Sequence, residues 1–181
     1  MAGLSSLFAA AFSLIWVDPY GDTPYLPNAF PAGGIETNQV SLAAAKGEIE
    51  TVSFSVKPER DMKKVDFVPT DLVGPGGAKI DASAADFALV KVWYRAGGRW
   101  ESSWAGNTAA PELINDLVLH DDDLIRVDEQ EKTIFLRIDY PHGAEYVDMK
   151  KRGEPHFNSS LHPVRDAKRF VPFDLRKGRF Q

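Results

Sequence analysis

Three consecutive carboxylates, Asp121-Asp122-Asp123, form the densest acidic cluster in the sequence. Two carboxyl groups about 5 to 10 Å apart across a cleft can hydrolyse a glycosidic bond, and several hard oxygens together can bind Ca²⁺. Neighbouring residues of an extended segment point in different directions, so these three do not form an acid–base pair by themselves. The spacing also lacks the Asp-x-Asp-x-Asp-Gly pattern of a calcium loop. We therefore interpret Asp121, Asp122 and Asp123 as a solvated turn, with a structural Ca²⁺ site as the alternative left open.

Aromatic residues provide a second kind of chemistry, because the apolar faces of sugar rings stack on Trp and Tyr planes. Four of them gather in one short region, namely Trp93, Tyr94, Trp100 and Trp104. We interpret the first two as core or sheet-face residues. The last two lie in a loop rich in Gly, Ser and Asn, where they either contact carbohydrate or pack against a partner domain or the loop itself. The candidate carbohydrate-binding residues are Arg99, Trp100, Glu101 and Trp104.

The sequence lacks the residues that several other kinds of site require. The sequence has no cysteine, which excludes disulfides, a Cys nucleophile and Cys-ligated zinc. Its four histidines show no His-Glu-x-x-His spacing, there is no Gly-x-Ser-x-Gly elbow, and Gly74-Pro75-Gly76-Gly77 lacks the Lys-Ser/Thr ending of a phosphate loop. A net charge of −5 argues against nucleic-acid binding. The sequence thus predicts no catalytic residue and no cofactor other than the optional Ca²⁺.

Alternation of apolar and polar residues with a period of two predicts strands that would position these residues. It is clearest over residues 48–57, 86–95 and 134–138, and we expect the second of these to be central and covered on both sides. Weaker strands are expected at residues 12–17, 40–43, 65–67, 124–127 and 146–149. Residues 111–119 are compatible with one helical turn. Many short strands separated by turn signals predict an all-β fold, an antiparallel β-sandwich of the jelly-roll type.

The organisation along the chain is that of one domain. Residues 1–11 are an N-terminal lead or the remnant of a signal peptide, and residues 12–181 form a single β-sandwich. A proline-rich arm at 18–34 is pinned to the body by its aromatic residues, and residues 150–169 form a long loop. A further strand begins near Phe170, which predicts that the natural protein continues beyond Gln181, because a sheet rarely ends with an unpaired edge.

The chain resembles the N-terminal β-sandwich of a bacterial family of putative glycoside hydrolases, in which this domain precedes a catalytic barrel similar to the N-acetylgalactosaminidase-type enzymes. The matching pieces occur in the family's order at residues 16–20, 24–27, 44–54, 90–94, 111–113, 121–128 and 171–175. The resemblance implies an extracellular or periplasmic protein whose catalytic residues lie on the barrel that follows. No catalytic residue can therefore be assigned to this chain.

Three hypotheses about the function follow. The first is a non-catalytic accessory domain of a glycan-degrading enzyme, which packs on the catalytic domain of the same parent protein and contacts the glycan. The alternative is a structural or surface-assembly protein that joins neighbouring copies of itself by strand addition. An independent enzyme is the least supported hypothesis, because no complete set of acid–base or nucleophilic residues is present.

Overall fold

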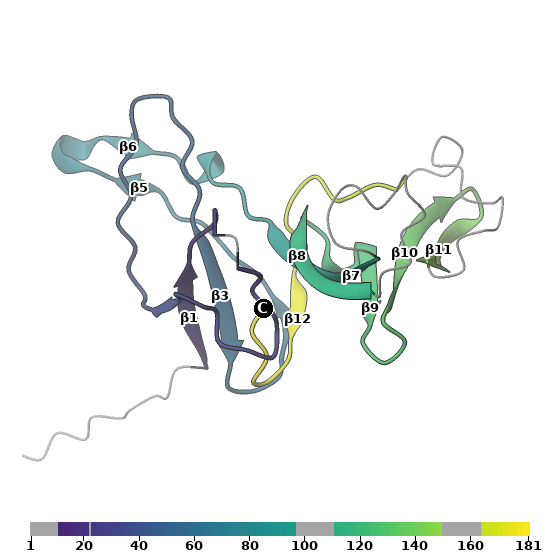
Figure 1. The fold of residues 1–181 in the computed structure, drawn as a ribbon. Helices are drawn as coiled ribbons and strands as arrows, with labels where there is room; N and C mark the ends of the chain where they lie inside the picture. Colours follow the sequence, from purple (N-terminus) through teal and green to yellow (C-terminus); the bar gives the residue numbers. More distant parts are fainter. Residues whose placement is uncertain (1–10, 22, 97–110, 150–163) are drawn as a thin grey trace, which may run out of the picture. The chain divides into compact units, whose positions relative to one another are not determined.

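The protein is described by a computed structural model that covers residues 11–21, 23–96, 111–149 and 164–181. Its described part is built from short antiparallel strands and a few 3₁₀ turns (Figure 1). The all-β class expected from the alternation is confirmed. The strands are arranged in sheets of two or three members, so the stacking of two large sheets into a sandwich stays a prediction.

The chain divides into two compact units, whereas the sequence predicts one domain over residues 12–181. Unit 1 consists of residues 1–63 together with residues 174–181, and unit 2 consists of residues 64–173. Unit 1 is therefore discontinuous in sequence, and unit 2 is inserted between its two pieces.

The sheet of unit 1 has the strand order β2-β1-β3. β1 (Phe12–Val17) pairs antiparallel with all of β3 (Ser53–Pro58) and with the two residues of β2 (Ile35–Glu36). Alternate side chains point inward, as the period of two predicts, and Ile15, Val17 and Val56 are each no more than 5 % exposed. The strands expected at 12–17 and 48–57 are thus confirmed, the latter in a shorter form.

In its described residues, 18–21 and 23–34, the proline-rich arm consists of turns and irregular segments without strands, as expected. Backbone hydrogen bonds close turns between Gly21 and Asp18 and between Gly34 and Pro31. The ring of Phe30 meets that of Phe180 edge-on at 5.7 Å, which agrees with an arm held by aromatic contacts. Tyr20, however, is 79 % exposed, so the expectation that it pins the arm is wrong.

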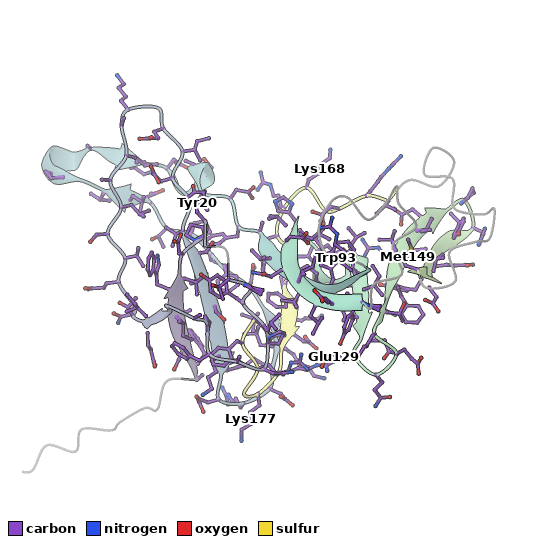
Figure 2. All side chains as sticks on the ribbon, in the orientation of Figure 1. Tyr20, Trp93, Glu129, Met149, Lys168 and Lys177 are labelled. Atoms are coloured by element: carbon purple, nitrogen blue, oxygen red, sulfur yellow. The ribbon has the colours of Figure 1, made fainter. Side chains whose placement is uncertain are left out.

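Unit 2 contains a hairpin and a three-stranded sheet. β7 (Leu89–Ala96) pairs with β8 (Pro111–Leu119), and the sheet has the order β11-β10-β9, formed by β9 (Ile125–Asp128), β10 (Thr133–Tyr140) and β11 (Gly143–Asp148). The turn predicted before residue 133 is formed by Asp128, whose carboxylate accepts the backbone N–H groups of Gln130 and Glu131; Glu129 marks this turn in Figure 2.

The core of unit 2 lies where these elements meet. Its buried members are Leu119, Leu124, Ile125 and Ile134. Trp93 and Tyr94 of β7 pack against this cluster, which confirms their interpretation as core or sheet-face residues. Burial of apolar surface stabilises the folded chain by about 25 cal/mol per Å². Leu119, Ile125 and Ile134 come from the end of β8 and the beginnings of β9 and β10, so their packing holds these three strand ends together.

Three local expectations are wrong. Pro111–Leu119 is strand β8 rather than a helical turn, because pairing with β7 over its whole length outweighs its weak local signal. β7 is not central: it belongs to a two-stranded sheet, and Val90 is 47 % exposed. Residues 40–43 form no strand, and Leu42 is 56 % exposed there.

A small hairpin precedes β7. β5 (Leu72–Val73) pairs with β6 (Lys79–Ile80), and η1 (Pro75–Gly77) forms the turn that the Gly-Pro-Gly-Gly sequence predicts. Gly76 and Gly77 have φ of 70° and 81°, the left-handed region in which glycine is favoured. A second 3₁₀ turn, η2 (Ala82–Ala84), follows.

The remaining strands are β4 (Met62–Val65) and β12 (Phe173–Leu175), which pair with each other in a two-stranded sheet. The strands expected at 65–67 and from residue 170 are thus present in part. Across the described ranges, none of the helices has the length and apolar character needed for a membrane span.

Candidate functional site: the aspartate turn of unit 2

The three aspartates lie on a tight turn between β8 and β9. The 3₁₀ turn η4 (Asp122–Leu124) begins with Asp121 as its N-cap, and the Asp121 carboxylate accepts the backbone N–H of Asp123 at 3.0 Å. Side-chain oxygens at this position satisfy backbone donors that the turn leaves unpaired. Leu124, the last residue of η4, and Ile125 after it are buried, so the turn is anchored to the hydrophobic core.

Asp121 forms the most enclosed ion pair of the turn. Arg137 Nη2, from β10, lies 2.8 Å from Asp121 Oδ2, and the two side chains are 21 % and 12 % exposed. Burial acts to lower the pKa of Arg137, but the hydrogen bond and charge of Asp121 outweigh it and raise that pKa on balance. Arg137 is therefore held charged and ties the middle of β10 to the start of η4.

Asp123 pairs with Arg126 and Tyr146. The Tyr146 hydroxyl donates to Asp123 Oδ2 at 2.6 Å, Arg126 Nε lies 3.1 Å from Oδ1, and the Arg126 guanidinium lies 3.5 Å from the centre of the Tyr146 ring. Burial followed by the Asp123 hydrogen bond raises the pKa of Tyr146. Burial acts to raise the pKa of Asp123, but Tyr146 and then Arg126 lower it on balance. The tyrosine is thus a donor and the aspartate an acceptor.

Asp122 pairs with Lys91, the only buried lysine among the described residues. Lys91 Nζ, from β7, donates to Asp122 Oδ1 at 2.6 Å and to the Asp122 carbonyl at 2.9 Å. A buried ammonium is strongly unfavourable without such partners. Lys91 therefore fastens β7 to the same turn that Arg137 fastens to β10.

A histidine between two carboxylates lies immediately before the turn. His120 Nε2 is 3.3 Å from Asp86 Oδ2, and His120 Nδ1 is 3.2 Å from Asp166 Oδ2. The pKa of His120 is raised, first by its hydrogen bond to Asp86. Asp166 also accepts the backbone N–H groups of His120 and Asp121 at 2.8 and 3.0 Å. This cluster joins three segments that are distant in sequence.

The arrangement supports a structural role for the aspartate turn. Each of the three carboxylates is directed to a different basic residue, and Asp121 is buried instead of solvated as expected from sequence. In the ranges that the structure describes, no three His, Cys, Asp or Glu side chains gather as a metal-binding group. The Ca²⁺ site at Asp121, Asp122 and Asp123 stays a prediction.

The aromatic candidates fall into two groups. Arg99, Trp100, Glu101 and Trp104 lie outside the described residues, so their role in carbohydrate binding stays a prediction. On the β7–β8 hairpin, the Asp116 carboxylate accepts the Trp93 indole N–H and one Arg95 N–H, each at 2.8 Å. The β7–β8 register shifts between Lys91 and Trp93, and such a bulge changes the direction in which a side chain points.

The sequence carries a signal for Lys91, which is a single charge on the apolar face of a strand and therefore requires a buried counter-charge. Arg137 carries no such signal, because it lies on the polar face of an alternating strand. Their partners are the aspartates singled out for other reasons. No comparable signal marks Asp86 or Asp166, because their contacts with His120 are long-range.

Comparisons with known proteins give no further assignment: no family model, no curated protein and no solved structure matches the chain.

Proposed function

We propose that this chain is a non-catalytic accessory β module of a glycan-degrading protein, and that it acts by binding a neighbouring protein domain. The observation that carries the proposal is a set of aliphatic side chains exposed on the β5–β6 hairpin: Leu72 is 65 %, Val73 76 % and Ile80 57 % exposed. Exposed apolar groups that lie together on one element are typical of surfaces that contact another protein.

The hairpin that carries these residues is held in place by its own charges. Lys79 Nζ lies 2.7 Å from Asp71 Oδ2, and Asp71 Oδ1 accepts the Ala82 N–H at 2.8 Å. Lys79 and then Ala82 lower the pKa of Asp71, so the carboxylate remains an acceptor in mildly acidic solution. A two-stranded hairpin alone is marginally stable, and a partner that covers its aliphatic side chains would stabilise it.

The absence of catalysis is supported by the aspartate turn. Its carboxylates are engaged by Lys91, Arg126 and Arg137, and a general acid requires a carboxyl group that can exchange its proton with the substrate. Contact with glycan is supported by the polar-aromatic group of Trp93, Arg95 and Asp116, on the two strands that flank in sequence the segment containing Trp100 and Trp104.

The proposal is tested by measuring three properties of the purified chain. We expect no hydrolysis of aryl glycosides, calorimetric binding to the catalytic domain of the same parent protein, and weaker binding for Leu72→Ser/Val73→Ser. The matched control, Val118→Ser, changes an aliphatic residue that is 64 % exposed on β8 and should bind normally. Hydrolysis by the chain alone, or equal binding by both variants, contradicts the proposal.

Glycan contact has a separate test. Binding to a glycan array should be lost in Trp100→Ala and Trp104→Ala while their urea unfolding midpoints stay unchanged. An absence of glycan binding by the folded parent chain would remove this part of the proposal and leave the protein contact standing.

A second candidate is assembly of neighbouring copies by strand addition. It is favoured by one observation: the edge of β3 opposite β1 is hydrogen-bonded through Val56 and Pro58 to Gln181 and Gly178, which follow unit 2 in the sequence.

A further inference from the structure

The outer edge of β3 is hydrogen-bonded to the backbone of Gly178 and Gln181. Val56 and Gln181 exchange both of their backbone hydrogen bonds, with Val56 N to Gln181 O at 2.6 Å and Gln181 N to Val56 O at 3.0 Å. This is the closely bonded pair of an antiparallel ladder. Gly178 N donates to the Pro58 carbonyl at 2.9 Å, so the added segment runs antiparallel to β3. Figure 2 labels Lys177, which lies directly before Gly178 in this segment.

Side chains of the same segment complete unit 1. Leu175 is 1 % exposed and belongs to unit 1. The Phe180 ring packs edge-on against Phe30 at 5.7 Å, with Lys57 Nζ 5.7 Å from its centre, and the Phe180 N–H donates to the Pro27 carbonyl. Full burial of a Leu side chain contributes about 1.5 to 3 kcal/mol, and the half-buried Phe180 contributes less than that. Unit 1 is therefore incomplete without residues 174–181.

In the sequence, residues 174–181 follow the whole of unit 2. Residues 64–173 form a separate compact unit between the two pieces of unit 1. Every contact described above is a contact between residues 1–63 and residues 174–181, and the same contacts form when the two pieces come from different copies. Exchange of an identical element between copies is a low-cost route to association for this reason.

We infer that unit 1 is a strand-exchange site, in which residues 174–181 of a second copy of this chain bind the outer edge of β3. Reciprocal exchange gives a closed dimer, and one-directional exchange gives a linear chain of copies. The inference deepens the strand-addition candidate and rests on it, and it is independent of the partner that binds the β5–β6 hairpin.

Engineered cysteines test the exchange directly, since the chain has no cysteine of its own. Ser55 Oγ lies 3.3 Å from the Gln181 carbonyl oxygen, and the adjacent Val56 exchanges backbone hydrogen bonds with Gln181, so cysteines at positions 55 and 181 would lie near one another. A Ser55→Cys chain and a Gln181→Cys chain are mixed at high concentration, loosened in mild urea, diluted and oxidised. We expect a disulfide-linked heterodimer on a non-reducing gel, with a several-fold lower yield when Phe180→Ala is added to the Gln181→Cys chain.

Two controls define the outcome. Ser83→Cys, at an exposed position of η2 in unit 2, replaces Ser55→Cys and should give no heterodimer above background. The double variant Ser55→Cys/Gln181→Cys should close an internal disulfide at low concentration. Closure of that internal bond without any heterodimer in the mixture would overturn the inference, yet it would leave binding by the β5–β6 hairpin untouched.

The unmodified chain provides a measurement that does not depend on how the variants fold. Light scattering of chain refolded at high concentration should show dimers or longer species that persist after dilution. Monomers alone at every refolding concentration would overturn the inference.

Discussion

The Arg137 guanidinium lies 2.8 Å from the Asp121 carboxylate, in a pair whose side chains are only 21 % and 12 % exposed. The pair links the centre of β10 to the turn that precedes β9. Together with the pair between Lys91 and Asp122, it fastens two separate strands to one turn. An acidic run that could be taken for a catalytic or calcium-binding site is thus a point of attachment within the fold.

Arg137→Met should lower the free energy of unfolding by about 2 to 4 kcal/mol, because it leaves the enclosed Asp121 carboxylate without its charged partner. Urea denaturation followed by tryptophan fluorescence measures this change. Glu145→Gln is the control, since its pair with His142 has side chains 59 % and 68 % exposed and should contribute less than about 0.5 kcal/mol. Equal effects of the two substitutions would contradict a structural role for the Asp121–Arg137 pair.

Stability should depend on pH through His120. Its pKa is raised above 6.5 in the folded chain, first by Asp86 and, after the opposing effect of burial, by Asp166. The contribution is therefore fully present below pH 6.5 and is lost as the pH rises through the raised pKa. The urea midpoint should fall between mildly acidic and mildly alkaline buffer, and His120→Gln should remove that fall.

Asp166 adds a dependence of the opposite sign. Burial acts to raise its pKa, but the backbone N–H groups of His120, Ala167 and Asp121 lower it on balance. Its contribution is present above its unfolded value and is lost as the pH falls through the lowered pKa. Asp166→Asn should therefore flatten the acid side of the stability profile, and an unchanged acid limb would show that Asp166 does not hold the turn.

Gly34→Ala should destabilise unit 1 by about 1 to 3 kcal/mol through overpacking. A Cβ at this position would lie 2.6 Å from Ile15 Cγ2 and 2.9 Å from the Pro31 carbonyl oxygen. Thermal or urea unfolding measures the loss. Gly74→Ala is the matched control, because its nearest neighbour would be 3.6 Å away, and it should unfold like the parent chain.

Leu175→Ala should lower the stability of unit 1 by about 2 to 5 kcal/mol, as for other fully buried leucines. Hydrogen exchange should then show faster exchange of amides in β1 and β3 and unchanged exchange in β10. Uniform loss of protection in both units would instead mean that the two units unfold together.

The strands with strict alternation could be predicted from sequence because one local signal, the period of two, determines which side chains are buried. Val56, Ile134 and Ile138 are buried at positions that this pattern selects. Pro111–Leu119 could not be predicted in this way, since its strand state depends on pairing with β7 along its whole length. The division into units also has no local signal, because it depends on residues 174–181 returning to β3.

The candidate site was predicted in part for the same reason. The aspartates at 121–123 are visible as a cluster in the sequence, and so is the turn that they form. Their partners Lys91, Arg137 and Tyr146 come from three other strands, and only the fold brings them together. An isolated charge in an apolar strand indicates that a buried partner exists, but it does not identify the partner.

The insertion of unit 2 between the two pieces of unit 1 has a consequence for biosynthesis. As the chain leaves the ribosome, residues 64–173 are complete before Leu175 and Phe180 have been synthesised. Unit 2 can therefore fold first. Until residues 174–181 have been synthesised, the outer edge of β3 does not have the hydrogen-bond partners that they provide. On a polysome, where copies are close to one another, that open edge is most exposed to residues 174–181 of a neighbouring copy.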